Sequence, residues 1–347
     1  MQYSQRLFGW ALAGGCALLI FSGCSNAGSS SQPPVAANSL GFTPFVSLDA
    51  GIRPAAGAGR ANGLVFVDPT ALKAQIYVAE YNSSTSSPVQ DFNAVDKNNK
   101  KAICHIDTVG EGVNSIAVDG SHELWVPQAL DLNTSSSDVL SFGPNCGAAG
   151  TTLVDPKGQA AGIAFASDGT RYVDDILGPS SSAGNVSVYS KGKTKPARYL
   201  TNPNIFLATG VGVDSKNNVY VSYHSSASAT GILLFKGGKM PGKPIAHVNL
   251  GAPGILTFDK KDDMIVTDDV NLTLNVYAPP YTGAPKVFPL QGASPQCSLN
   301  AAQTNLACGD KTNASVDIYS YPGGKYEYSF NKGLDSGTVI GVAQDPI

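Results

Sequence analysis

The sequence predicts an all-β fold, a single β-propeller of about six four-stranded blades, on three observations. A phrase of two apolar strands joined by a polar turn recurs along the chain. The strands are short, and their turns are rich in Gly, Asn, Asp and Lys, as hairpins require. No stretch after the N-terminal segment combines helical periodicity with caps. The clearest copies are SIAVDGSHELWV (115–126), GIAFASDGTRYV (162–173), GVGVDSKNNVYV (210–221) and ILTFDKKDDMIV (255–266).

The spacing of the copies predicts the number of blades. Equivalent positions follow one another at intervals of 42 to 51 residues, which is the length of a four-stranded blade. These positions are Asp68, Asp119, Ala166, Asp214, Asp259, Ala301 and Asp345. Six intervals predict six blades. A seventh copy begins at the C-terminus with GVAQDPI (341–347), and residues 42–48 remain at the other end of the chain. The ring could therefore close in two ways, through one blade shared by both ends of the chain or through a seventh blade.

Each second strand is followed by two further stretches with the alternation of a β-strand. After the copy at 210–221 they are GILLFKG (231–237) and IAHVNL (245–250). A lone four-stranded sheet leaves both faces uncovered, and packing several sheets in a ring buries those faces. Small residues such as Gly210 and Gly212 suit the crowded centre, where the first strands converge.

Composition limits the class of protein. Of 347 residues, 14% are charged and 42% are hydrophobic, a balance typical of a compact domain. The formal net charge is −3, without the basic excess that neutralises phosphates. We therefore expect no nucleic-acid partner.

The N-terminus predicts export and a lipid anchor. An apolar run at residues 7–21 ends at Phe21-Ser22-Gly23-Cys24. Small residues before a cysteine resemble a bacterial lipoprotein signal, which makes residues 1–23 the signal peptide and Cys24 the lipidated residue. An ordinary secretory signal and an uncleaved anchor are the alternatives, although the run is shorter than the about 20 residues of a membrane span.

Residues 24–62 are expected to form a flexible tether and a lead-in strand, and residues 63–347 the propeller. The stretch SNAGSSSQPPVAAN (25–38) is small and polar, so it cannot bury apolar area. By resemblance to Gram-negative lipoproteins, Ser25 in place of Asp favours the outer membrane. We expect a cell-envelope protein, periplasmic or surface-exposed, that contacts the membrane through its lipid alone.

Four cysteines remain after the signal and Cys24, an even number that suits disulfides in an exported protein. Three pairings are open. Cys297 and Cys308 flank the hairpin of the sixth copy, whereas Cys104 and Cys146 fall in neighbouring blades. These positions predict the pairs Cys104–Cys146 and Cys297–Cys308.

The repeated phrase also resembles a known family. Its form, G-[IV]-x-[VF]-D-x-x-x-N-[VIL]-[YW]-V, is similar to NHL-type and related propeller repeats of bacterial surface proteins. The resemblance covers residues 63–347 and implies the propeller fold without a particular function. Two copies lack the Asp, and the Asp-x-x-Asn-x-Arg-[IV] tail usual after the second strand is absent.

Polar residues just after the second strands are the main candidates for chemistry. In a ring these positions meet on one face, where carboxylates could ligate a divalent cation. The competing interpretation is a solvated acidic rim bonded to loop amides, because acidic residues at strand ends are common turn formers. The residues are Glu80, Gln128, Asp174, Asp175, His224, Asp268, Asp269 and Asp310.

The four histidines are interpreted as ordinary surface or strand residues. His122 falls in a hairpin turn, and His105 and His247 fall in fourth strands near the outer edge. None lies at metal-ligand spacing from another histidine, and no catalytic motif such as G-x-S-x-G is present.

Two functions of different class follow. The first is a non-enzymatic envelope protein whose propeller face binds an unidentified protein, glycan or small ligand, with no catalytic residue and no cofactor. The second resembles the lactonase-like propellers, metal-dependent hydrolases in which a central Ca²⁺ polarises a lactone carbonyl. Its candidate ligands here are Glu80, Asn114 and Asp268. A propeller hosts many functions, so the fold alone does not choose.

Overall fold

The computed structural model describes residues 74–81, 88–93, 102–107, 112–113, 115–131, 136–155, 158–178, 182–334 and 338–345. The chain divides into two units, Met1–Ala36 and Ala37–Ile347, and every described residue belongs to the second. The expected signal peptide, Cys24 and the expected tether therefore lie outside the described residues.

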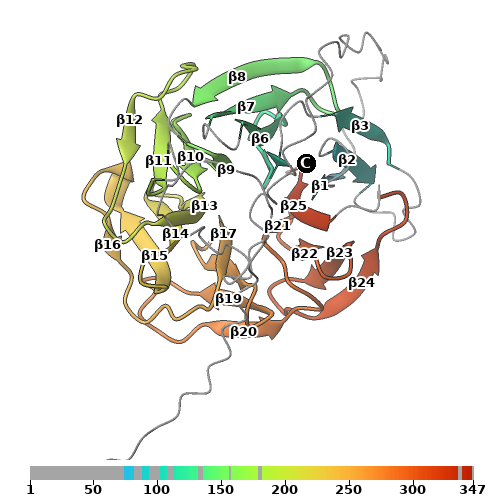
Figure 1. Cartoon of the computed structure of the whole chain (residues 1–347). Coiled ribbons are helices and arrows are strands. Elements are labelled where there is room, and N and C mark those ends of the chain that lie inside the picture. Colours follow the sequence, from blue (N-terminus) through green and yellow to red (C-terminus); the bar gives the residue numbers. More distant parts are fainter. Residues whose placement is uncertain are drawn as a thin grey trace, which may run out of the picture. The chain divides into compact units, whose positions relative to one another are not determined.

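The second unit is an all-β propeller (Figure 1). Its described strands form six antiparallel sheets around a common centre, five with four strands and one with five. Each sheet runs from an inner strand to an outer strand at the rim, in chain order except in the first sheet. The predicted propeller with four-stranded blades is confirmed.

The first three sheets have the following strands, in order from the inner to the outer position. The first sheet contains β25 (Thr338–Gln344), β1 (Gln75–Tyr81), β2 (Pro88–Asn93) and β3 (Cys104–Asp107). The second contains the short β4 (Gly112–Val113) and β5 (Ala117–Val118), then β6 (Leu124–Asp131), β7 (Ser136–Phe142) and β8 (Ala149–Asp155). The third contains β9 (Ala160–Phe165), β10 (Arg171–Asp175), β11 (Asn185–Tyr189) and β12 (Arg198–Leu200).

The other three sheets follow the same order. The fourth contains β13 (Leu207–Val213), β14 (Val219–His224), β15 (Thr230–Phe235) and β16 (Lys243–Pro244), with a short 3-10 turn, η3 (Lys236–Gly238), before β16. The fifth contains β17 (Pro253–Phe258), β18 (Met264–Asp268), β19 (Thr273–Tyr277) and β20 (Lys286–Pro289). The sixth contains β21 (Cys297–Leu299), β22 (Asn305–Asp310), β23 (Ser315–Ser320) and β24 (Tyr326–Phe330).

Small residues let the inner strands approach one another, as the sequence predicts. A Cβ atom on Gly210 in β13 would lie 2.7 Å from the Cα atom of Ile255 in β17, closer than real Cβ contacts allow. A Cβ atom on Gly212 would lie 2.8 Å from the Cβ atom of Leu256. Any side chain at these positions would therefore push the fourth and fifth sheets apart.

The Asp of the repeated phrase shapes the turn between the first and second strands. Asp214 Oδ1 accepts the N–H groups of Lys216 (2.9 Å) and Asn218 (2.8 Å), two and four residues further on. Asp119 and Asp259 accept the N–H groups at the same two offsets. The repeat therefore encodes a turn in which a side chain satisfies main-chain donors.

A left-handed residue in each of these turns reaches the preceding sheet. Asn217 has φ 59°, and its Oδ1 accepts the N–H of Ser167 from the third sheet (2.9 Å). Asp262 (φ 62°) accepts the N–H of Ser215 in the same way, and Gln303 (φ 54°) accepts that of Lys260. These bonds join neighbouring sheets along one face of the ring.

The C-terminal strand closes the ring. β25 pairs with β1 from Ile76–Gln344 to Tyr81–Thr338, so the last start of the phrase supplies the inner strand of the first sheet. The structure thus shows the shared sheet, one of the two closures that the sequence left open. Asp68, the first of the equivalent positions in the sequence, lies outside the described residues.

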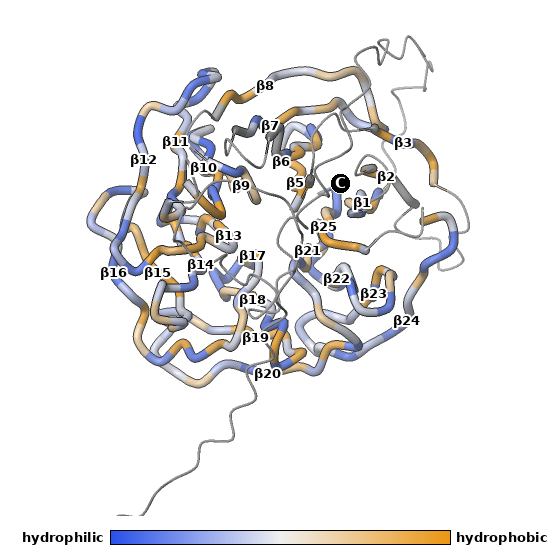
Figure 2. Tube along the Cα trace, in the orientation of Figure 1, coloured by the Kyte–Doolittle hydropathy of each residue, from blue (hydrophilic) through white to orange (hydrophobic). Residues whose placement is uncertain are grey.

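Hydrophobic side chains fill the spaces between neighbouring sheets. One cluster joins the third and fourth sheets through Val188, Leu200, Val221 and Leu233. Figure 2 shows hydrophobic residues along the strands, whereas hydrophilic residues are frequent along the outer turns. No helix within the described ranges is long and apolar enough to cross a membrane.

Candidate functional site

The polar residues at the ends of the second strands are buried. Glu80, Gln128, Asp175, Asp268 and Asp310 are each at most 1% exposed, although they come from five different sheets. A solvated acidic rim was one interpretation of the sequence, and that interpretation was wrong because these side chains are shielded from solvent. Their function depends on which donors each side chain meets inside the protein.

Asp268 ends β18 and binds main-chain donors on two sides. Its Oδ2 accepts the N–H of Gly251 (2.7 Å), and its Oδ1 accepts that of Ala252 (3.0 Å), both in the segment that enters the sheet. Oδ1 also meets the N–H groups of Val270 and Asn271 (3.2 Å each), and Oδ2 accepts the Asn271 side-chain amide (2.7 Å). Burial raises the pKa of Asp268, but these hydrogen bonds outweigh it and hold the pKa below its usual range.

Asp310 in β22 repeats the hydrogen bonds to the following turn. Its Oδ1 accepts the N–H groups of Thr312 (2.8 Å) and Asn313 (2.9 Å), and its Oδ2 accepts the Asn313 side-chain amide (2.7 Å). The carboxylate packs against Gly292, where any Cβ would clash with it. Asp-x-x-Asn is thus a turn motif of the fifth and sixth sheets. The absence of the complete Arg-containing tail had hidden this shorter signal in the sequence.

A second carboxyl group lies beside Asp310. Burial, and then the neighbouring Asp310 carboxylate, raise the pKa of Asp317 in β23 to about 7. Ser315 Oγ (3.2 Å) and Tyr319 OH (3.4 Å) donate to the Asp317 carboxyl oxygens. Both carboxyl groups are buried, and the two donors to Asp317 come from its own strand.

Asp174 in β10 differs from the other second-strand carboxylates. Both of its carboxyl oxygens are buried, and neither has a hydrogen-bond partner on another residue within the described ranges. Burial raises the pKa of Asp174 to about 7. A Cβ on Gly162 would lie 2.5 Å from Asp174 Oδ1, so this glycine makes room for the carboxyl group. The equivalent positions in four of the other five sheets hold small residues, Ala79, Ser222, Thr267 and Gly309, and the second sheet has Pro127.

The histidines follow the sequence expectation in part. His122 lies in the turn between β5 and β6, and its Nδ1 lies 2.6 Å from Asp345 Oδ1 of the first sheet. His105 in β3 and His247 after β16 are exposed. His224 ends β14 and is fully buried, where desolvation lowers its pKa to about 4.

Gln296 ties three sheets together near the centre of the ring. Its Oε1 accepts the N–H groups of Ile116 (3.2 Å) in the second sheet and Val342 (3.1 Å) in the first. Its Nε2 donates to the Ile116 carbonyl (2.7 Å). Because Gln296 immediately precedes β21, its amide links the sixth sheet to the first two. No sequence pattern had singled out this residue.

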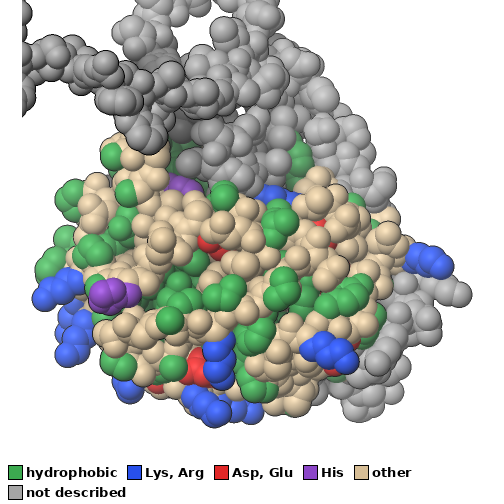
Figure 3. All heavy atoms as spheres, turned by 90° about the horizontal axis from the view of Figure 1, so that it is seen from below, with side chains coloured by type: hydrophobic (Ala, Val, Ile, Leu, Met, Phe, Trp, Pro, Cys, Tyr) green, Lys and Arg blue, Asp and Glu red, His purple; other side chains and the backbone are tan. Residues whose placement is uncertain are grey.

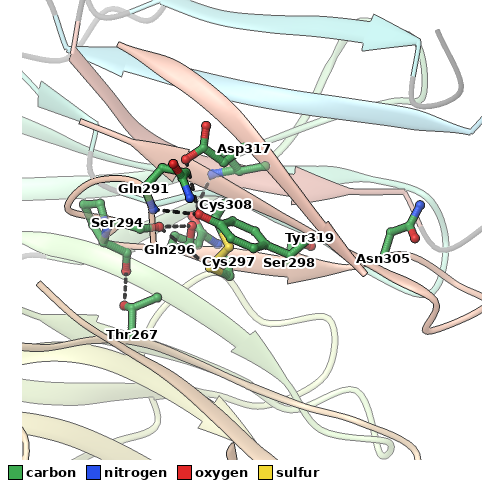
Figure 4. The surroundings of a disulfide bond; sticks show 12 residues. Thr267, Gln291, Ser294, Gln296, Cys297, Ser298, Asn305, Cys308, Asp317 and Tyr319 are labelled. Atoms are coloured by element: carbon green, nitrogen blue, oxygen red, sulfur yellow. Dashed lines mark hydrogen bonds between the residues drawn. A yellow bond between two sulfur atoms is a disulfide. The ribbon is translucent and has the colours of Figure 1, made fainter. Parts of the chain in front are cut away.

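The disulfides have the predicted pairing. Cys297 and Cys308 face each other directly in β21 and β22, with their Cα atoms 4.1 Å apart. Figure 4 shows this bond with Gln296 nearby and with Tyr319 from the same sheet. The Cys104–Cys146 bond joins β3 to the turn after β7, with Cα atoms 6.1 Å apart. It therefore links the first and second sheets through an outer strand.

The three metal-ligand candidates do not form a described site. Glu80 belongs to the first sheet and Asp268 to the fifth, with the sixth sheet between them (Figure 1). Asn114 lies outside the described residues. Within the ranges that the structure describes, no group of three or more His, Cys, Asp or Glu side chains is arranged to hold a metal ion.

Comparisons with known proteins support the fold. No protein-family model matches the chain, and no curated protein matches it in sequence. Among solved structures, a nidogen/laminin complex is similar with a TM-score of 0.62 and 17% identity, over 78% of this chain and 98% of the matched chain. A protein of unknown function from Bacteroides caccae has a TM-score of 0.59 and 12% identity, over 79% and 100%.

TolB from Acinetobacter baumannii is also similar, with a TM-score of 0.58 and 13% identity, over 79% of this chain and 67% of that chain. At these identities the likeness shows the fold alone. The matched structures are of different proteins, so the shared fold does not indicate a function, and the function has to be inferred from the residues of this chain.

Proposed function

We propose that this protein is a lipid-anchored cell-envelope propeller of six blades that binds a protein, glycan or small ligand and is not an enzyme. The observation that carries the proposal is the use of the second-strand carboxylates. Asp268 and Asp310, two of the candidate residues after the second strands, accept hydrogen bonds from the segments around them. Their role is to hold the shape of the ring.

The blade count follows from the closure of the ring. Six described sheets and one strand shared between the two ends of the chain account for the six repeat intervals. A seventh blade would need a strand partner for β1 other than β25. We therefore favour six blades over seven.

The alternative hydrolase needs oxygen ligands that are free to face a cation. Ca²⁺ takes six to eight such ligands. Both Asp268 oxygens already bind N–H groups, and redirecting them would leave those donors buried without partners. The Gln296 amide also joins inner strands near the ring centre, where the alternative would place the ion.

The anchor rests on the sequence around Cys24 and on the disulfides. Disulfides persist in oxidising compartments such as the periplasm and the cell surface. Two of them fit an exported protein, and the apolar run that ends at Cys24 supplies the export signal. We place the lipid on Cys24 and the protein at the outer membrane.

The anchor is tested by Cys24→Ala with Cys16→Ala as the matched control. We expect Cys24→Ala to abolish incorporation of labelled palmitate and to release the protein from the detergent phase or block its processing. Cys16→Ala should change neither property. Unchanged labelling and partitioning of Cys24→Ala would refute the anchor.

The non-enzymatic role is tested with a panel of lactones in the presence of Ca²⁺ or Zn²⁺. We expect no turnover above the uncatalysed rate. Metal-dependent turnover that disappears in Asp268→Asn, while circular dichroism shows an intact fold, would overturn the proposal in favour of the hydrolase.

A further inference from the structure

Two turns at the rim of the third and fourth sheets concentrate positive charge. Residues 184–250 contain eight Lys or Arg and one Asp, in a chain whose formal net charge is −3. Seven of the eight lie in or beside the turns that follow β11 and β15, and all seven are exposed. We call them the basic rim: Lys191, Lys193, Lys195, Arg198, Lys236, Lys239 and Lys243.

Hydrogen bonds join the two turns into one surface. Arg198 Nη2 donates to the carbonyl of Gly238 (2.9 Å), and Asn202 Nδ2 donates to that of Gly242 (3.0 Å). Gly238 has φ 62° and lies against the hydroxyl of Tyr172, so a larger residue would not fit there. The cations of both turns therefore share one fixed edge of the ring.

Little negative charge offsets the basic rim. Asp214, the single acidic residue of the segment, is buried in its own turn, where it binds Asn218 and Tyr220. Asp168 is an exposed neighbour, and its pKa is lowered by hydrogen bonds from Thr170 and, more weakly, by Arg198. Figure 3, which views the ring from below the orientation of Figure 1, shows Lys and Arg side chains spread around the edge of that face and fewer Asp or Glu.

We propose that the basic rim docks on a bilayer surface that carries anionic phospholipid. The tip of the second turn combines charge with apolar area, because Met240 is 55% exposed between Lys239 and Lys243. Exposed Pro241 and Pro244 extend this apolar area. Cations around an apolar tip match the headgroup interface, where lysines meet phosphates and apolar side chains enter the acyl boundary.

The shape and composition of the basic rim favour a membrane over a polymer chain. Single-stranded nucleic acids are bound by aromatic side chains in a charged groove. The two turns, KGKTKPAR (191–198) and KGGKMPGKP (236–244), contain no aromatic residue and follow the outer edge of the ring. An extended anionic surface fits such an edge.

This inference rests on the proposed envelope location and adds a second membrane contact to the lipid. Each lysine near an anionic surface contributes only modestly to binding. A domain already held near the bilayer by its lipid needs little more to settle in one orientation. The basic rim would then fix which edge of the propeller faces the membrane.

The test measures vesicle binding by co-sedimentation, using the full chain with Cys24→Ser so that the lipid does not contribute. Vesicles of phosphatidylcholine alone are compared with vesicles that also contain phosphatidylglycerol. We expect a preference of at least about tenfold for the anionic vesicles, lost at high salt. The triple variant Lys193→Gln, Lys239→Gln, Lys243→Gln should lose that preference.

A matched control removes the same charge elsewhere. Lys286→Gln, Lys325→Gln, Lys332→Gln alters exposed lysines of the fifth and sixth sheets and should keep the preference. Equal loss in both triple variants would overturn the assignment to the basic rim. No preference for phosphatidylglycerol, or binding to dextran sulfate without binding to vesicles, would overturn the membrane as the partner. The unsubstituted lipidated chain on neutral vesicles reports on the anchor separately.

Discussion

Two consecutive aspartates occur at the end of the second strand in both the third and the fifth sheet, but they are placed differently. Asp174 and Asp175 are the last two residues of β10, whereas Asp268 is the last residue of β18 and Asp269 follows it. In the fifth sheet, Asp268 binds N–H groups of the segment before the sheet and of the turn after its strand. In the third sheet, Asp174 has no hydrogen-bond partner on another residue of the described chain. Their pKa values move in opposite directions as a result.

The difference comes from register and from the residue that follows. Asp268 occupies the last position of its strand, and Asn271 three residues later completes the turn. Asp174 lies one position earlier, where four of the other five sheets carry small residues against the inner strand. A carboxylate at the last position of the strand therefore stabilises the turn, whereas a carboxylate one position earlier is buried without a donor among the described residues and destabilises the fold.

The largest expected effect is loss of the Asp268 carboxylate. Asp268→Ala should lower the free energy of unfolding by about 3 kcal/mol, because several buried N–H groups lose their acceptor. Urea unfolding followed by circular dichroism measures the change. A loss below about 1 kcal/mol would mean that these hydrogen bonds do not hold the turn.

The same substitution at Asp174 should act in the opposite direction. The folded pKa of about 7 lies above the usual 3.8, so the folded state binds the proton more tightly than the unfolded chain. The ionisation penalty is absent below about pH 4, grows as the pH rises, and is complete above about pH 7. Asp174→Ala should therefore stabilise the protein by about 1–2 kcal/mol at pH 8, with no such gain at pH 4.

The measurement for Asp174→Ala is the difference from wild type in urea unfolding at each pH. Other buried carboxyl groups, such as Asp317, have raised pKa values and give both proteins a common pH dependence. A destabilisation of Asp174→Ala at pH 8 would show that its carboxylate has a favourable partner.

A smaller effect is expected for the amide that completes the turn. Asn271→Ala removes one donor to Asp268 and leaves the main-chain donors in place. It should cost about 1 kcal/mol, as should Asn313→Ala in the sixth sheet. Asn249→Ala, an exposed position outside these turns, serves as the control in the same urea series.

The sequence predicted the fold and the cysteine pairs because both depend on periodic signals. A phrase at a nearly constant interval fixes the sheets, and Cys297 and Cys308 fall on either side of one hairpin. The sequence left the closure by β25 open. The segment before Asp68 and the C-terminal segment 341–345 both carry the pattern of a first strand, and only the long-range pairing with β1 shows which one forms the inner strand.

The site was harder to predict because the local sequence pattern does not show which polar side chains are buried. Gln296 follows no motif, and its bonds to Ile116 span 180 residues. The basic rim was hidden by the net charge of −3, since an average over the chain conceals a local excess. The shorter Asp-x-x-Asn motif was detectable in the sequence, but only the longer motif that includes an Arg was considered.

The central claim, that Asp268 holds turns and not a cation, is tested most directly by thermal unfolding of wild type and Asp268→Asn. Each protein is heated in excess EDTA and in excess CaCl₂, because a cation bound to the folded state raises the midpoint by mass action. We predict that the midpoint of wild type is the same in both solutions. A rise with Ca²⁺ in wild type that is absent in Asp268→Asn would contradict the account.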